Sequence, residues 1–324
     1  MKLRLWMPWL LALLLAGPQA VPAQPAAAGP VRFIVTLPPG GSLDVIARRL
    51  APHMAASWGH VPATENKAGA GGTIAADYVA RPSTGSTPLL VTTASTFTIV
   101  PHLFRRLPYD PDKDLRPLVQ LGTTRFVLLV RSDDAARDLR ALLERARDAR
   151  EPVSFGSFGN GSVTHVIGEA INAAAGVRML HVPYRGTSPA ITDLLGGQLT
   201  AVISDIGTAQ PFLDGRLRAL AVTGGARLPA LPDVPTFGEQ GLASLDPYVS
   251  WVGIFVPAWV PEQTAARLAE DLSRQLRSDE LKSELNAHGY EATGTTGEEF
   301  RALLLRDRQR WGSVMRQIGA IQVN

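Results

Sequence analysis

Apolar runs rich in β-branched residues alternate along this chain with glycine-rich turns, and each turn is followed by a helical pattern. The order recurs at "FIVTLPPGG" before an expected helix at 44–58, "TPLLVTTAS" before "TFTIVPHLF", "PVSFGSFGNGS" before "VTHVIGEAINAAAG", and "MLHVPYRGTS" before "PAITDLLGG". Repeated strand, turn and helix units are typical of parallel sheets with crossover helices. The sequence therefore predicts an α/β fold with mostly parallel sheets rather than an all-α or all-β fold.

The turns of such a fold are expected to share one crevice. In a parallel α/β sheet they lie beyond the carboxyl ends of the strands, so their N–H donors converge there. The clearest two are "PGGS" at 39–42 and "SFGNGS" at 157–162, and each opens a helix. The N-terminal end of a helix favours an anion. Two such ends could each receive one carboxylate of a small organic acid, although each turn taken alone could be only a helix cap.

The first turn does not match a nucleotide-phosphate loop. Such a loop needs Lys and then Ser or Thr directly after its last glycine, and "GGSLD" supplies neither in register. Asp44 lies in the expected first helical turn, where it would repel a multiply charged phosphate. We therefore expect a smaller anion.

The N-terminus has the pattern of a secretory signal. Lys2 and Arg4 precede an apolar run at 5–16, and small residues follow up to Ala23. The run is shorter than the roughly 20 residues of a membrane span. We expect a signal peptide at 1–23, cleaved after Ala23. The chain has no cysteine, which excludes both disulfides and a lipid anchor through an N-terminal cysteine.

Charge and composition exclude some functions. The 324 residues carry a formal net charge of +3 that is spread along the chain, so no nucleic-acid partner is expected. A hydrophobic content of 45% in a chain of this length is enough for one large domain or two lobes.

Catalytic and metal-binding motifs are sparse. Ser157 in "FGSFG" lacks the first glycine of a G-x-S-x-G elbow. His165, close after Ser162, and His181, on an expected strand, can each be structural. No H-E-x-x-H motif and no group of acids at ligand spacing is present. We expect no catalytic residue, metal or cofactor, and keep an exported hydrolase using Ser157 or Ser162 with His165 as the alternative.

Two apolar strands suggest how the chain divides. "FVLLVRSD" at 126–133 and "VGIFVPAWVP" at 252–261 each run into a polar or proline-rich turn. As paired hinge strands they would place the middle of the chain in one lobe and both ends in the other. Beyond them, amphipathic helices are expected around a short strand near "GYEATG", with Trp311 on a packing face.

A family resemblance runs over nearly the whole mature chain. It is carried, in order, by "LPPGGSLDVIARRLA", "ENKAGAGGTIAADYVAR", "PYDPDKDLRPLV", "GSFGNGSVTHVIGE", "HVPYRGTSPAITDLLGGQL", "LRALAVTGGAR", "PDVPTFGEQGL" and "WVGIFVPAWVP". Together these segments resemble the extracytoplasmic solute receptors of the tripartite tricarboxylate transporters, the TctC or Bug-type family.

The resemblance implies an α/β, type II-like, two-lobed periplasmic binding protein. Each lobe would be a mixed, mostly parallel sheet flanked by helices, and two hinge strands would join them. Lobe 1 would comprise 30–125 with the hinge return and C-terminal part at 252–324, and lobe 2 would comprise 126–251. The implied protein is a periplasmic monomer without catalytic activity. It would capture a small carboxylate and deliver it to the large and small membrane subunits of a transporter, or alternatively be read by a membrane sensor kinase.

The resemblance also implies a set of ligand-binding residues, used largely through backbone N–H groups and ordered water. One pincer would consist of Pro39, Gly40, Gly41 and Ser42, with Asp44 positioning water or an amino group of the ligand. The other would consist of Ser157, Gly159, Asn160, Gly161 and Ser162, supported by His165. The crevice would be lined by Thr93 and Ser95 from the first lobe and by Arg185, Gly186 and Asp205 from the second. Valine in place of Gly41 or Gly161 is expected to block backbone approach to the ligand.

Some roles stay open at this point. Arg185 could clamp a carboxylate with both arms of its guanidinium, or be a solvated turn residue. Asp205 could instead cap the helix that follows it. The identity of the carboxylate is also open, because selectivity is expected to depend on crevice shape, set by side chains such as Phe158, Tyr184 and Trp251.

The segment at 84–89, "TGSTPL", departs from the D-G-Y-T-L run of the family. Proline cannot donate a hydrogen bond within a sheet, so Pro88 predicts a strand that begins late or lies at an edge.

Overall fold

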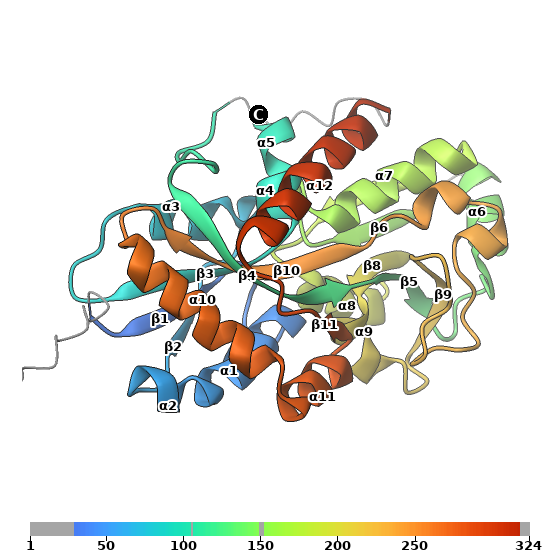
Figure 1. Cartoon of the computed structure of the whole chain (residues 1–324). Coiled ribbons are helices and arrows are strands. Elements are labelled where there is room, and N and C mark those ends of the chain that lie inside the picture. The colour runs from blue at the N-terminus through green and yellow to red at the C-terminus, as the bar shows by residue number, and fades with distance from the viewer. Residues whose placement is uncertain (1–28, 105, 149–151, 318–324) are drawn as a thin grey trace, which may run out of the picture.

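A computed structural model of the chain describes residues 29–104, 106–148 and 152–317 (Figure 1). The expected signal peptide at 1–23 and its cleavage after Ala23 lie outside the described residues. Within the described ranges, no helix has both the length and the apolar character needed to cross a bilayer.

The chain forms two sheets flanked by helices, an α/β architecture as predicted. The first sheet has the strand order β11-β4-β10-β3-β1-β2 and the second the order β7-β6-β8-β5-β9, and the two lie side by side in Figure 1. The strands are β1 (Val31–Val35), β2 (Ala63–Asn66), β3 (Thr87–Thr93), β4 (Leu115–Thr124), β5 (Phe126–Arg131), β6 (Ser154–Ser157), β7 (Leu180–Pro183), β8 (Ala201–Asp205), β9 (Leu217–Val222), β10 (Ser250–Pro257) and β11 (Tyr290–Ala292).

Helices follow most of the strands, at the turns that the sequence pattern indicated. The α-helices are α1 (Ser42–His53), α2 (Ala55–Trp58), α3 (Thr73–Ala80), α4 (Ser95–Thr98), α5 (Val100–Leu103), α6 (Leu139–Asp148), α7 (Val163–Ala175), α8 (Thr187–Leu195), α9 (Ile206–Ala209), α10 (Glu262–Leu276), α11 (Asp279–Ala287) and α12 (Gly297–Gln317). Short 3-10 helices lie at Ala70–Gly72, Gln210–Phe212, Gly238–Gln240 and Ala243–Leu245.

Both sheets are mixed, and the expectation of mostly parallel pairing is wrong in detail. Only the strand, turn and helix units pair in parallel: β1 with β2 and β3, and β6 with β7 and β8. The strands β4, β5, β9, β10 and β11 pair antiparallel. Three strands, β5, β10 and β11, run opposite to the parallel strands of their sheets. β4 and β9 run in the same direction as the parallel strands and pair antiparallel because their neighbours are the reversed strands.

Each sheet is covered on both faces, because alternate strand residues point to opposite sides. In the first sheet, Phe33 packs with α1, α10 and α11, whereas its neighbour Ile34 packs with α3, α4 and α12. In the second sheet, Leu128 packs with α6 and α7, whereas Val127 packs with α8 and α9. The helices therefore hold the carboxyl ends of the strands in fixed positions.

The two apolar strands expected to form a paired hinge do not pair with each other. β5 is central in the second sheet, between β8 and β9, and β10 is central in the first, between β3 and β4. Both edges of each strand are occupied, which leaves no edge for mutual pairing. The chain instead crosses between the sheets next to Thr124 and next to Ser250, which are partners in the β4–β10 ladder.

Pro88 lies inside the first sheet, and the expectation of a late or edge strand is wrong. β3 begins at Thr87 and runs between β1 and β10. Thr87 N–H donates to Pro30 O on the β1 side, so the nitrogen of the next residue, Pro88, faces the β10 side. β10 pairs with β3 only from Leu90 onward. The missing donor of Pro88 therefore has no ladder to interrupt.

Helix α12 contacts both sheets. Phe300 packs in the core of the first sheet, and Trp311, which is 2% exposed, packs in the core of the second. This confirms Trp311 as a packing residue. We keep the division into lobes at 30–125, 126–251 and 252–324 as a proposal, with α12 as the element that spans it.

Candidate ligand-binding site

A cleft between the two sheets lies beyond the carboxyl ends of β1, β3, β6 and β7. It is lined by Thr36, Leu37, Gly69, Gly71, Gly72, Thr93 and Ser95 from the first sheet's side and by Phe158, Ser162 and Arg185 from the second. Among these residues Arg185 alone carries a charge. The cavity is about 20 Å³, room for about one water molecule, so the two sides are closed on each other.

Some of the residues predicted from the sequence line the cleft, and others do not. Thr93, Ser95, Ser162 and Arg185 line the cleft. The remaining predicted residues lie in the surrounding turns or behind them: Pro39, Gly40, Gly41, Ser42, Asp44, Ser157, Gly159, Asn160, Gly161, His165, Gly186 and Asp205. Their contacts show what each turn is built to do.

In the first turn the backbone donors already have partners within the protein. Gly40 N–H donates to Asp44 Oδ2 (3.0 Å) and Gly41 N–H to Pro38 O (3.4 Å). Ser42 N–H donates across the cleft to Thr208 Oγ1 (3.2 Å). This turn, in its closed position, therefore binds the opposite side of the cleft.

Asp44 holds the first turn in shape. Besides Gly40, its carboxylate accepts from the side chains of Arg48 (3.0 Å) and Asn66 (2.9 Å). Burial would raise the pKa of Asp44, but these hydrogen bonds outweigh burial and hold the pKa below its usual value. Asp44 thus stays ionised, and its two carboxylate oxygens accept hydrogen bonds from other residues of the protein.

The second turn ends in the start of α7, where the sequence places a good cap. Ser162 Oγ accepts from His165 N–H (3.2 Å), as expected of a serine at this position. The next donor, Val163 N–H, reaches across the cleft to Ser95 Oγ (3.0 Å). The N-terminus of α7 therefore points at the cleft, and the hydroxyl of Ser95 from the other side accepts a hydrogen bond from it.

Two stacked histidines support the second turn from behind. The rings of His165 and His181 stack with centroids 3.7 Å apart. Gly161 N–H donates to His165 Nδ1 (3.3 Å), and Ser157 Oγ lies 2.6 Å from His181 Nε2. Burial lowers the pKa of His165 to about 4; burial, reinforced by His165, lowers the pKa of His181 to about 3. Both rings are therefore neutral near pH 7.

We expect the free energy of unfolding to fall as the pH is lowered from about 6.5 toward 4. The folded-state pKa values lie below the ordinary 6.5 of histidine, so the unfolded chain binds more protons in this range. The contribution of the neutral histidines to the free energy of unfolding is complete above pH 6.5 and declines by roughly 3 kcal/mol for each histidine as the pH reaches 4. Denaturant unfolding at several pH values measures the slope.

The control for this pH effect is a non-titrating pair. His165→Asn keeps an acceptor at the Nδ1 position and His181→Gln keeps one at the Nε2 position. The double variant should flatten the pH dependence. A slope equal to that of the parent protein would show that the histidines do not cause it.

Asp205 caps a helix rather than lining the cleft. It accepts from Thr208 N–H (2.9 Å) at the start of α9 and from Thr208 Oγ1 (2.9 Å). Thr208 Oγ1 in turn accepts from Ser42 N–H, and Ser42 Oγ lies 2.8 Å from Tyr290 Oη. Burial raises the pKa of Asp205 against the hydrogen bonds that lower it. The capping alternative is thus the one that the contacts support, and the buried chain of hydroxyls links the two sides.

Gly186 and Gly161 lie where the two sides approach closely, whereas Gly41 does not. A Cβ on Gly186 would lie 2.6 Å from Pro38 Cγ, and one on Gly161 would lie 2.7 Å from Leu103 Cδ1. Both glycines have positive φ, +144° and +77°. Gly41 has φ −75°, and its nearest contact would be 3.5 Å. A side chain at Gly161 would therefore clash with the opposite side of the cleft, whereas one at Gly41 would not clash within the protein. Blocked approach of the ligand at either glycine stays a prediction.

Sequence reasoning missed part of the cleft. The segment from Gly69 to Gly72 lines it with positive φ at every residue, including Ala70 at +48°. A Cβ on Gly72 would lie 2.2 Å from Thr96 Oγ1, so the backbone approaches its neighbour too closely for a side chain. The signal was "GAGG" before a helix, the same pattern as the two turns that were recognised.

Of the aromatic residues expected to shape the crevice, Phe158 lines it. Trp251 does not: it is 2% exposed, packs in the core and donates to Asp307 Oδ2 (2.9 Å). Tyr184 donates to Asp193 Oδ2 (2.6 Å). The Trp251 expectation fails because a strand residue of the first sheet points into one of its two cores.

The hydrolase alternative lacks an accessible nucleophile. Ser157 pairs with His181 instead of His165, and it is 0% exposed. Ser162 Oγ contacts Thr164 Oγ1 and the backbone of His165, not its ring. Neither serine meets the geometry of an activated nucleophile open to substrate.

Two mixed sheets that close on a cleft at their strand ends define a bilobal solute-binding protein. The model of the tripartite tricarboxylate transporter family receptor, TctC, matches residues 46–320. The chain belongs to this family, and is therefore a solute receptor and not an enzyme.

Relatives match over most of their length. The UPF0065 protein in the tcbD-tcbE intergenic region of Pseudomonas sp. is 36% identical over 286 residues, 87% of this chain and 84% of its own. Protein BugT of Bordetella pertussis is 30% identical over 310 residues, 94% of each chain.

Solved structures share the fold. R. palustris Rpa4515 with adipate has a TM-score of 0.85 at 26% identity, covering 91% of this chain and 99% of that one. The periplasmic binding protein BugD has a TM-score of 0.83 at 28% identity, covering 91% and 99%. MatC from Rhodopseudomonas palustris with bound malate has a TM-score of 0.80 at 29% identity, covering 88% and 98%.

Proposed function

We propose that this protein is a periplasmic receptor that closes on a small organic carboxylate and delivers it to the membrane subunits of a tripartite tricarboxylate-type transporter. The observation that carries the proposal is the charge pattern of the cleft. Arg185 faces a lining that is otherwise uncharged, with hydroxyls from Thr93, Ser95 and Ser162. A guanidinium and several hydroxyl or amide donors suit a carboxylate. Related structures contain adipate and malate, ligands of this class.

The closed turns indicate how a ligand would be held. Val163 N–H, at the start of α7, now donates to Ser95 Oγ, and Ser42 N–H donates to Thr208 Oγ1. When the lobes part, these donors lose their partners and become available at helix starts. A carboxylate that enters between them would replace the lost acceptors, as anions do at helix N-termini.

The support for membrane delivery and for the location comes from the family rather than from the cleft. The matched model describes a receptor of a tripartite transporter, and BugD is a periplasmic binding protein. A periplasmic location agrees with the secretory pattern predicted for residues 1–23. The large and small membrane subunits are the proposed partners.

A melting panel tests the proposal. We expect one or a few di- or tricarboxylates to raise the melting temperature, with sugars and phosphate without effect. At a hundredfold excess over the dissociation constant the ligand adds about 2.7 kcal/mol, which corresponds to several degrees. Mass spectrometry of the denatured protein guards against a ligand retained from expression. A response to sugars or phosphate alone would contradict the proposal.

A further inference from the structure

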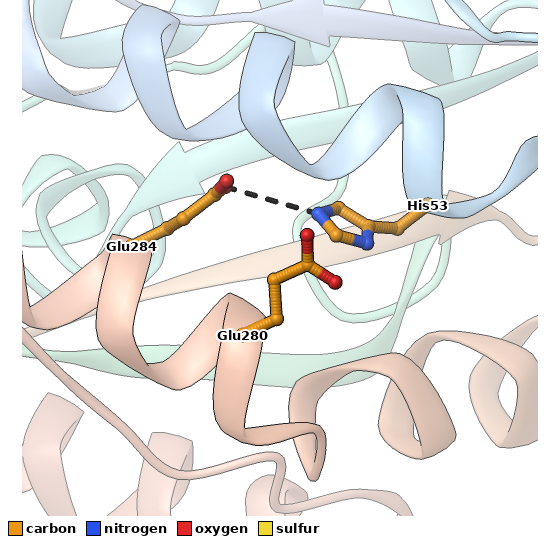
Figure 2. A group of neighbouring side chains, drawn as sticks. All are labelled: His53, Glu280 and Glu284. Atoms are coloured by element: carbon orange, nitrogen blue, oxygen red, sulfur yellow. Dashed lines mark ion pairs between the residues drawn. The ribbon is translucent and has the colours of Figure 1, made fainter.

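The inference concerns a group of side chains away from the cleft. His53 ends α1, and Glu280 and Glu284 lie one turn apart on α11. Figure 2 shows the three side chains reaching toward one another from the two helices, with a dashed line joining Glu284 to the His53 ring. One ligand atom from each lies within 4.8 Å of the others. The set contains an imidazole nitrogen and two carboxylates, the donors that first-row transition metals take.

The group is held in place by the core beneath it. Leu50 of α1 and Leu281 and Leu285 of α11 belong to one buried cluster. His53 is 18% exposed and Glu284 is 29% exposed, so both are partly withdrawn from water. Glu280 is exposed. The packing of α1 against α11 therefore fixes the backbone positions from which the three side chains extend.

The distance between the His53 and Glu284 side chains is too long for a hydrogen bond. His53 Nε2 and Glu284 Oε2 lie 3.8 Å apart, beyond hydrogen-bond range. Glu284 Oε2 is fully buried and has no hydrogen-bond partner. Such an atom costs free energy unless something else satisfies it. Two donors that share a zinc ion, each about 2.0–2.2 Å from it, are roughly 3.4 Å apart, so a small inward movement would complete the geometry.

We propose that His53, Glu280 and Glu284 bind a divalent transition-metal ion, with zinc as the representative, and that water completes its coordination. Three protein ligands and one water are a common zinc arrangement. The ion would join the end of α1 to α11 and neutralise two carboxylates. No metal site was expected from the sequence because it has no H-E-x-x-H motif, no cysteine pair and no recognised group of acids at ligand spacing. Glu280 and Glu284 are four residues apart on one helix, but their third partner, His53, is distant in the chain.

Titration calorimetry of protein expressed as the full-length chain, stripped with EDTA and free of a polyhistidine tag, tests the site. We expect one zinc ion per chain and a higher melting temperature with zinc. His53→Ala, Glu280→Gln and Glu284→Gln should each weaken zinc binding at least tenfold. Asp279→Asn, on the same first turn of α11 but outside the group, is the matched control and should bind zinc like the parent protein.

Two further readouts keep the test decisive. Cobalt(II) should give the visible absorption of a low-coordinate site, lost in the same variants, whereas magnesium and calcium, which prefer all-oxygen ligands, should not compete. Glu280→Gln changes only an exposed charge, so it remains informative if His53→Ala fails to fold. The proposal is overturned if the parent protein binds no zinc, or if the three variants bind it as tightly as Asp279→Asn does. Binding of carboxylates in the cleft should be unchanged, which separates this site from the proposed function.

Discussion

Replacing Gly186 with alanine should lower the affinity for the receptor's carboxylate at least tenfold, about 1.4 kcal/mol or more. The new Cβ would lie 2.6 Å and 2.7 Å from two ring atoms of Pro38. The ring of Pro38 is part of the stiff first turn and cannot rotate away. Because these residues belong to opposite sides of the cleft, the clash opposes closure while each lobe can still fold. Titration calorimetry with the carboxylate selected by the melting panel measures the effect.

The control for Gly186 is Gly215. Gly215 also has a positive φ, +109°, but a Cβ there meets nothing within 4 Å. Alanine at either position carries a backbone cost of about 1–3 kcal/mol. Only Gly186→Ala adds a contact across the cleft. If both variants bind the carboxylate equally well, closure through this contact is not needed for binding.

Replacing Arg185 with alanine should weaken carboxylate binding by about ten- to a hundredfold, because a hydrogen bond to a charged group contributes about 1.5–3 kcal/mol. Arg185→Lys keeps the charge but loses the two-pronged geometry, and should give an intermediate affinity. The loss should shrink for neutral analogues such as the monoamide. Calorimetry at two salt concentrations measures both the affinity and its electrostatic part.

Arg178 offers a matched control for Arg185. It precedes β7, whereas Arg185 follows β7, so the two arginines lie at opposite ends of the same strand. Both are exposed. Arg178→Ala should leave the affinity unchanged. An Arg185→Ala protein that binds as tightly as Arg178→Ala would assign Arg185 to the solvated surface.

Local patterns predicted the units that are local. A β-branched run, a small-residue turn and an amphipathic helix form β1 with α1, and β6 with α7, where the pattern placed them. The cap at Ser162 follows from the same chemistry. These features depend on neighbours in the sequence, which is why one sequence was enough to find them.

Features that depend on distant partners were not predictable in this way. The reverse direction of β5 and β10 depends on how the chain crosses between the sheets, and the interior position of Pro88 depends on where β10 stops pairing. The Ser157–His181 contact joins two neighbouring strands, β6 and β7, whose sequences carry no common signal for it. The segment from Gly69 to Gly72 had a local signal, but it lies after a short strand at the sheet edge and was not weighed with the other turns.

The closed cleft has a consequence for the kinetics of the receptor. With a cavity of about 20 Å³, and with Ser42 and Val163 bonded to the opposite side, the closed form has no path for a dicarboxylate to its site. Capture must then wait until the lobes part, so at high ligand concentration the association rate levels off at the opening rate instead of rising in proportion. The hydrogen bonds that span the cleft would thus set the rate at which an unloaded receptor opens and becomes able to bind a ligand.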